Sequence, residues 1–262
     1  MPTIERNGRV IHYTQEGQGR GVVLVPGLGS GAKLFGTLPR RFHKLGFTCA
    51  AVDPVGLAPS GPLPDGNYSF DEAAHDVLAV ARTLPQPCAL VGTSLGGKVA
   101  LRAASLDPDS VSALVMLCSS AFATARSKRV YRMFELLCTE VDGAHFGELV
   151  APFLFGSTFL SSRKAVVDDI LRGMKPTADS RAFMRSQARA LQEFDGANDA
   201  AACRARTLCL SGAEDTLTEP RDVEATSHAI QGSRYRCMPD AGHSLLLETA
   251  AALDEVAAFL AE

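Results

Sequence analysis

The sequence predicts an α/β protein in which a mostly parallel central sheet is flanked by helices. Short apolar runs alternate with stretches of helical periodicity along most of the chain, and strands buried on both faces by helices form parallel sheets. The length of 262 residues suits one core carrying a modest insertion. With 46% hydrophobic and 21% charged residues, the chain has enough apolar material to fold on its own.

The first part of the chain alternates strand and helix after an opening hairpin. Asn7-Gly8 tolerates the backbone of a tight turn, so residues 4–13 are expected to form two antiparallel strands. Asp107-Pro108 is expected to stop a helix. The expected strands are 21–25, 47–52, 88–91 and 111–118, and the expected helices are 32–44, 70–83 and 94–106.

The alternation breaks between residues 121 and 195, where helical, mixed-charge sequence surrounds an apolar interruption at 151–156. We expect this segment to be an inserted helical cap, and residues 1–120 and 196–262 to form the core. The core then resumes with expected strands at 206–210 and 235–238 and expected helices at 220–229 and 244–261.

Composition limits the partners and the cellular compartment that we expect for this chain. A net charge of −3 provides no positive field for a phosphate backbone, so nucleic-acid binding is not expected. The seven cysteines include no CxxC pair and mostly lie in apolar runs, which predicts reduced core residues in a cytoplasmic protein. The charged N-terminal residues do not resemble a secretory signal, and the apolar run at 111–118 is too short for a membrane helix.

The sharpest motif is Gly-Thr-Ser-Leu-Gly at 92–96, placed between an expected strand and an expected helix. A serine on such a tight strand-to-helix turn is held clear of the sheet, and the amides of the helix N-terminus favour negative charge beside it. Ser94 is therefore the candidate nucleophile. The alternative is an ordinary glycine-rich turn with a helix-capping serine.

A nucleophilic serine needs a base, and the base needs an acid that fixes its tautomer. His243 follows the last expected strand, whereas the other five histidines lie on the hairpin, on helices or in the insertion. Asp215 follows an earlier strand end and is the expected acid. Glu214 and Asp240 are its rivals.

The glycine-rich run after the first central strand has two interpretations. Gly27, Gly29 and Ala32 fit a dinucleotide fingerprint, with Asp53 a further 21 residues along as the ribose-binding acid of an NAD-dependent oxidoreductase. That interpretation leaves Ser94 and His243 unexplained. In the preferred one, the backbone amides of Leu28 and Leu95 face one oxygen and form an oxyanion hole.

Ser94, Asp215 and His243 occur in the order typical of the α/β-hydrolase family, which the chain resembles over nearly its whole length. Residues 53–60, Asp-Pro-Val-Gly-Leu-Ala-Pro-Ser, are similar to the family's D-x-x-G-x-G-x-S turn. Pro26 is a departure, because relatives commonly have histidine there. The resemblance implies an α/β-hydrolase fold with a helical cap inserted after the sixth strand.

The expected activity is that of a cofactor-free serine hydrolase that cleaves small-to-medium apolar carboxylic esters through an acyl-enzyme intermediate. A serine at position 94 excludes the family branches that use aspartate there. Lactones, thioesters, acyl-carrier-protein esters and C–C bonds of β-diketones stay open, since all pass through similar oxyanions. A non-catalytic ligand receptor on the same scaffold is the alternative of another class. Neither a metal nor a cofactor is expected.

The expected cap carries eight of the 13 phenylalanines. Phe122, Phe153, Phe155 and Phe159 are candidates to line an apolar acyl pocket, although packing of the cap helices accounts for most of these rings. The cap also groups four basic residues, which suit either a solvated helix face or an acidic carrier protein as partner. These are Arg126, Lys128, Arg129 and Arg132.

Overall fold

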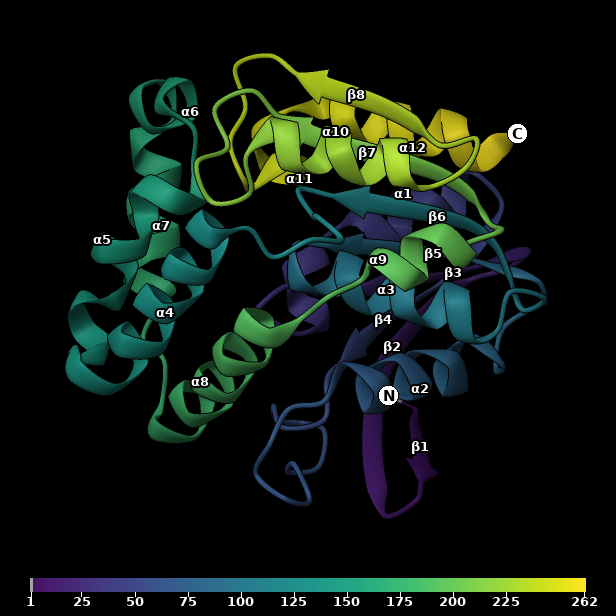
Figure 1. The fold of residues 1–262 in the computed structure, drawn as a ribbon, viewed down its shortest axis with the longest axis horizontal. Coiled ribbons are helices and arrows are strands. Elements are labelled where there is room, and N and C mark those ends of the chain that lie inside the picture. Colours follow the sequence, from purple (N-terminus) through teal and green to yellow (C-terminus); the bar gives the residue numbers. More distant parts are fainter. Residues whose placement is uncertain (1) are drawn as a thin grey trace.

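One eight-stranded sheet runs through the computed structural model, which describes residues 2–262 (Figure 1). The strand order is β1-β2-β4-β3-β5-β6-β7-β8, and β2 is antiparallel to both of its neighbours while the remaining pairs are parallel. The strands are β1 Thr3–Arg6, β2 Arg9–Gly17, β3 Arg20–Val25, β4 Phe47–Asp53, β5 Cys88–Thr93, β6 Val111–Leu117, β7 Arg206–Gly212 and β8 Arg234–Met238. This architecture confirms the predicted fold class.

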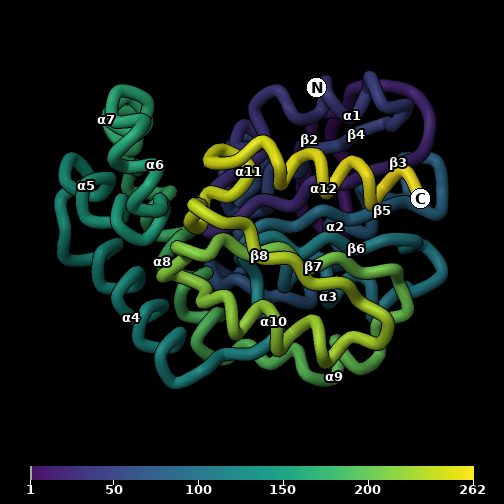
Figure 2. The backbone as a smooth tube through the Cα atoms, turned by 90° about the horizontal axis from the view of Figure 1, so that it is seen from above, coloured from purple at the N-terminus to yellow at the C-terminus, as the bar shows by residue number. Residues whose placement is uncertain are grey.

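Helices cover both faces of the sheet (Figure 2). Successive side chains of a strand point to opposite faces, so β3 sends Val22 and Leu24 into one apolar cluster and Val23 and Val25 into the other. The first cluster includes residues of α1 (Leu38–Lys44) and α12 (Ala250–Ala261). The second includes residues of α2 (Phe70–Ala81), α3 (Leu95–Leu106) and α10 (Pro220–Ala229). Burial on both faces explains why β3 to β6 are nearly continuous apolar runs.

Six helices lie between β6 and β7, and the first five of them stand beside the sheet, at the left of Figure 1. Thr124 and Thr177 cap the two longest of them by accepting hydrogen bonds from the amides of Ser127 and Ser180, both at 3.2 Å. The five helices fall within residues 121–195, where the sequence predicts the cap. They are α4 Ala125–Glu140, α5 Gly143–Leu154, α6 Ser157–Ser162, α7 Lys164–Gly173 and α8 Ala178–Glu193.

Several predicted elements differ from the structure. The expected helix at 32–44 is a 3₁₀ turn, η1 (Ala32–Phe35), followed by α1, because Gly36 adopts a left-handed φ of 49°. The expected last helix divides at Thr249 into α11 (Leu245–Glu248) and α12. The short helix α9 (Ala197–Ala202) was not expected. The apolar interruption predicted at 151–156 instead begins inside α5.

Cysteine placement needs one correction. Six of the seven cysteines are buried, as predicted, but Cys237 is exposed because it lies on the edge strand β8. None of the helices within residues 2–262 has both the length and the apolar character needed to span a bilayer.

Candidate active site

Ser94 occupies a sharp turn between β5 and α3. Its φ of 53° and ψ of −121° are unusual for a residue with a side chain. The turn is this tight because glycines stand on either side: a Cβ at Gly92 would collide with the Gly96 carbonyl, and one at Gly96 would collide with the Val25 carbonyl. The half-buried Ser94 side chain therefore stands at the carboxyl end of the sheet, as the motif predicts.

The glycine-rich run after β3 lies directly against this turn. A Cβ built on Gly27 would be 3.4 Å from the Ser94 Cβ, so the two segments touch. The Ser30 amide donates to the Gly27 carbonyl at 3.2 Å, and Gly29 has a φ of 67°, which defines a tight turn with Leu28 at its first corner. Leu95 begins α3. The two residues predicted to form an oxyanion hole thus lie on adjoining segments.

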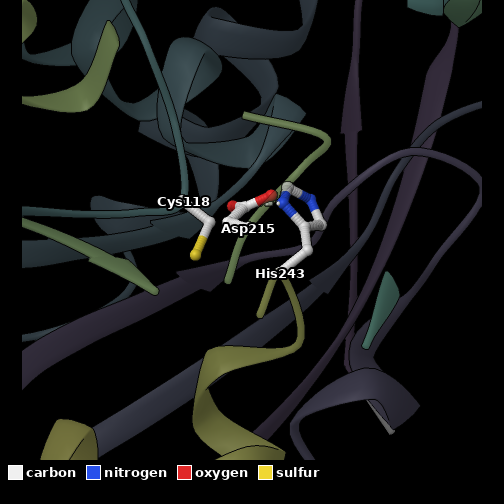
Figure 3. A group of neighbouring side chains, drawn as sticks. All are labelled: Cys118, Asp215 and His243. Carbon is white, nitrogen blue, oxygen red and sulfur yellow. Dashed lines mark hydrogen bonds and ion pairs between the residues drawn. The ribbon is translucent and has the colours of Figure 1, made fainter. Parts of the chain in front are cut away.

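Asp215 and His243 form a buried pair (Figure 3). The His243 Nδ1 and the Asp215 Oδ2 are 2.8 Å apart. The Asp215 Oδ1 accepts hydrogen bonds from the Leu217 and Thr218 amides, both at 2.9 Å, which fixes the carboxylate. An acid held in this way orients the imidazole and stabilises it once it takes up a proton.

The two rival acids are engaged elsewhere. The Glu214 carboxylate accepts from the Thr158 amide at 2.9 Å and from the Thr158 hydroxyl at 2.6 Å, so it joins the β7 loop to the cap. Asp240 lies in an exposed turn with a φ of 54°. Of the three candidate acids, Asp215 is the one whose carboxylate is hydrogen-bonded to His243.

Backbone hydrogen bonds bring the strand ends together at this edge of the sheet. The Ser94 amide donates to the Leu117 carbonyl and the Cys118 amide donates to the Leu210 carbonyl, both at 2.8 Å. These bonds join the ends of β5, β6 and β7. Asp215 follows β7 and His243 follows β8, so the residues predicted from sequence all lie where parallel strands end, which is the usual position of sites in open α/β sheets.

Cys118 lies beside the acid–base pair and was not singled out from the sequence. One ligand atom each from Cys118, Asp215 and His243 lie within 4.8 Å of one another, a composition that resembles a metal site (Figure 3). Burial, reinforced by the negative charge of Asp215, raises the pKa of the Cys118 thiol well above its usual value. A protonated thiol is a poor metal ligand, and the Asp215–His243 bond already uses the imidazole Nδ1.

Glu248 organises the loop that carries His243, and the sequence motifs did not reveal it. Its carboxylate accepts from the amides of Gly242 at 2.7 Å, Gly156 at 2.9 Å and Ser244 at 3.0 Å. Burial raises the pKa of Glu248, and these three hydrogen bonds oppose the shift. The neighbours of His243 in sequence are therefore tied to the cap residue Gly156 through one side chain.

Asp53, the acid of the dinucleotide interpretation, is committed to contacts within the chain. Its Oδ1 accepts from the Ala32 amide at 2.8 Å, and its Oδ2 lies 2.7 Å from the His12 Nδ1. The Asp53 side chain is only 8% exposed to solvent. This geometry leaves it no freedom to bind a ribose and explains the residue as an anchor of the loop after β3.

The four candidate pocket phenylalanines divide among different clusters. Phe155 and Phe159 stack with ring centroids 5.7 Å apart in an apolar cluster of the cap, and the backbone of Phe155 lies against Gly242, the neighbour of His243. Phe122 packs against the core cluster that contains Val23 and Val25. Phe153 packs against the cluster that also includes Leu217, two residues beyond Asp215. A role in an acyl pocket stays a prediction for all four phenylalanines.

Half of the predicted basic cluster is engaged with other residues of the chain. Arg126 donates to the Thr216 carbonyl at 2.6 Å, and Arg132 pairs with Glu135 at 2.6 Å. Lys128 and Arg129 are exposed on α4. The remaining charge suits a solvated helix face, and docking of an acidic carrier protein at the cap stays a prediction.

A family model described as alpha/beta hydrolase fold matches residues 21–250. The match spans most of the chain, including the turn after β3, Ser94, Asp215 and His243. The chain belongs to the alpha/beta hydrolase family.

Individual relatives agree with this assignment. The chain is similar to the serine hydrolase BPHL of Homo sapiens, 27% identical over 260 residues, covering 96% of this chain and 82% of that protein. It is 34% identical over 110 residues to the pimeloyl-[acyl-carrier protein] methyl ester esterase of Aliivibrio fischeri (strain MJ11), covering 42% and 40%. The enol-lactonase of Burkholderia xenovorans LB400 shares its fold at a TM-score of 0.88 and 23% identity, with 100% of both chains covered. By family and relatives, the protein is a hydrolase.

Proposed function

We propose that the protein is a serine hydrolase that cleaves carboxylic esters of small to medium apolar acyl groups without a cofactor. The observation that carries the proposal is the buried Asp215–His243 pair, 2.8 Å between Oδ2 and Nδ1, at the same sheet edge as a serine held in strained backbone geometry. Three residues of suitable chemistry, far apart in sequence, follow the ends of β5, β7 and β8.

Each group has a defined part in the proposed reaction. His243 accepts the proton of the Ser94 hydroxyl as the oxygen attacks the ester carbonyl, and Asp215 stabilises the resulting imidazolium. The Leu28 and Leu95 amides donate to the tetrahedral oxyanion. Collapse of that intermediate breaks the ester C–O bond, and His243 gives the proton to the leaving alcohol. Water, activated by His243, then attacks the acyl-enzyme, releases the carboxylic acid and restores Ser94.

An apolar acyl group suits the cluster between the cap and the catalytic loops. This cluster joins buried side chains of α4, α5 and α8 to Leu217, and Leu28 packs against it from the oxyanion turn. Apolar surface next to polar reactive groups is typical of small-molecule sites. The name of the relative from Aliivibrio fischeri, a methyl ester esterase, supports an oxygen ester as the bond cleaved.

Ester hydrolysis by a Ser94→Ala variant tests the proposal. We expect the purified parent protein to hydrolyse p-nitrophenyl acetate and butyrate, and the variant to lose at least about 10⁴-fold in kcat, because nothing else can form the acyl-enzyme. Ser112→Ala is the matched control, since this exposed serine lies on β6 near its amino end, away from the site. Equal turnover by the parent and Ser94→Ala would overturn the proposal.

A further inference from the structure

The side chain of Gln187 connects the cap to the turn that carries Leu28. Gln187 lies on α8 and is fully buried, at 0% exposure. Its Oε1 accepts a hydrogen bond from the Gly29 amide at 2.8 Å, across 158 positions of sequence. The cap therefore holds the backbone of the residue that directly follows Leu28.

A second contact from α8 reinforces this hydrogen bond. Met184 lies one helical turn before Gln187 and packs so closely on Gly29 that a Cβ at position 29 would collide with its side chain. Gly29 also needs its left-handed φ of 67° to close the turn. Leu28 packs against two apolar clusters: the core cluster that contains Val23 and Val25, and the cluster of α4, α5 and α8 that contains Leu217. The turn is thus clamped between α8 and the sheet.

The hydrogen bond to Gly29 also fixes the orientation of the Gln187 amide. An amide flip would set an NH₂ group against the Gly29 N–H, two donors facing each other, so the Oε1 has to point toward the turn. The buried Gln187 Nε2 makes no hydrogen bond of standard geometry within residues 2–262, although the Gln187 side chain also interacts with that of Tyr68. Gln187, Pro26, Leu95 and Tyr68 line a cavity of about 20 Å³, room for about one water molecule.

We propose that Gln187 is a positioning residue that couples the cap to the oxyanion hole. By holding the Gly29 amide, it keeps the peptide on the other side of Leu28 aimed at the reacting oxygen. The inference rests on the proposed function, since it concerns the step in which the Leu28 amide stabilises the oxyanion. Because hole donors act only if they are oriented before the reaction, a loosened turn lowers kcat more than it weakens substrate binding.

The test uses two substitutions at this position and one matched control. Gln187→Met keeps the approximate volume and removes the acceptor, so we expect kcat to fall by about tenfold or more and KM to change by less than about threefold. Gln187→Glu keeps an acceptor for Gly29 but introduces a carboxyl group that can ionise beside the developing oxyanion. Its kcat relative to the parent should fall as the pH rises, whereas the ratio for the Met variant should not vary with pH.

Gln192→Met is the control, because Gln192 lies on the same helix and donates to Glu135 at 3.1 Å, not to the turn. Its kinetic constants should match those of the parent. A readout without substrate is amide hydrogen exchange followed by NMR: exchange at Gly29 should be faster in Gln187→Met and unchanged in Gln192→Met. If the Met variant does not fold, Gln187→Leu, which also removes the acceptor for Gly29, takes its place with the same expected kcat and exchange rate.

The outcomes separate this inference from the proposed function. Ser94-dependent turnover together with a Gln187→Met kcat within twofold of the parent, or an unchanged Gly29 exchange rate, would overturn the coupling and leave the hydrolase intact. Turnover that does not depend on Ser94 would overturn the proposed function, and the role of Gln187 with it.

Discussion

At the scale of single residues, Lys98 is unusual because its charged side chain is almost completely buried. It lies on α3 four positions after Ser94 and is 2% exposed. Its ammonium group donates to the Ser120 carbonyl and lies 4.9 Å from the centroid of the Phe194 ring. Burial lowers the pKa of Lys98 to about 7, and the negative charge of Asp222 opposes the shift. Because Ser120 precedes α4 and Phe194 follows α8, Lys98 contacts both connections between cap and core.

A Lys98→Met substitution should change how stability depends on pH. An unfolded lysine keeps its proton up to about pH 10.4, whereas folded Lys98 loses it near 7. Between these two pH values, folding releases a proton from Lys98, so this residue makes the free energy of unfolding rise with pH. Below pH 7 Lys98 is protonated in both states, and the destabilisation caused by burying its charge does not change with pH. We expect the parent to gain stability relative to the Met variant between pH 7 and 10. Urea unfolding midpoints at pH 6, 7.5 and 9.5 check this.

The comparison with the variant isolates Lys98 from other groups that titrate above pH 7. If the midpoints of parent and Lys98→Met shift in parallel over this range, Lys98 keeps an ordinary proton affinity in the folded protein and the account of this residue is wrong. The Met variant should also be the more stable protein at pH 6, where it avoids a buried charge.

At the scale of elements, α4 and α8 are joined through one carboxylate. Glu135 on α4 pairs with Arg189 of α8 at 2.7 Å and with Arg132 at 2.6 Å, and accepts from Gln192 at 3.1 Å. The hydrogen bond from Arg189 is the largest cause that lowers the pKa of Glu135 to about 2. The Glu135 side chain is 8% exposed, whereas both arginines are at least half-exposed, so solvent screens part of the attraction.

A Glu135→Gln substitution should loosen the cap in a pH-dependent way. A lowered pKa means that the stabilisation is present above the ordinary value for glutamate, about 4.3, and is lost as the pH falls toward 2. We expect the variant to cost about 1 kcal/mol at pH 7 and less at pH 3. Thermal unfolding at both values measures the difference. Glu140→Gln, an exposed position on the same helix, should leave stability unchanged, and an equal cost for both variants would contradict the account.

How well elements can be predicted from sequence depends on how local their causes are. The parallel strands were predictable because burial on both faces requires continuous apolar runs, as in β4 and β6. Helix α9 spans six residues, too few for a periodic pattern to show. The break between η1 and α1 depends on the left-handed backbone of Gly36, and an isolated glycine in a helical pattern does not predict that conformation.

At the scale of the whole molecule, the candidate site could be predicted in part. Motifs after strands pointed to Ser94, His243 and Asp215, but only the structure shows that the carboxylate of Asp215, and not that of the adjacent Glu214, is hydrogen-bonded to His243. Glu248 and Gln187 carried no signal in sequence. Glu248 accepts from the amide of Gly156, 92 positions away, and Gln187 accepts from the amide of Gly29, 158 positions away. Since every residue except proline has a backbone amide, no sequence pattern marks such a partner.

The measurement that tests the central claim most directly is covalent labelling with a fluorophosphonate, followed by tryptic mapping. Cleavage after Arg82 and Lys98 releases residues 83–98, in which Ser94 is the only serine. We predict that the label lies on Ser94, that Ser94→Ala is not labelled, and that His243→Ala is labelled far more slowly because the base is lost. Labelling at another residue, or equal labelling of the parent and Ser94→Ala, would contradict the account.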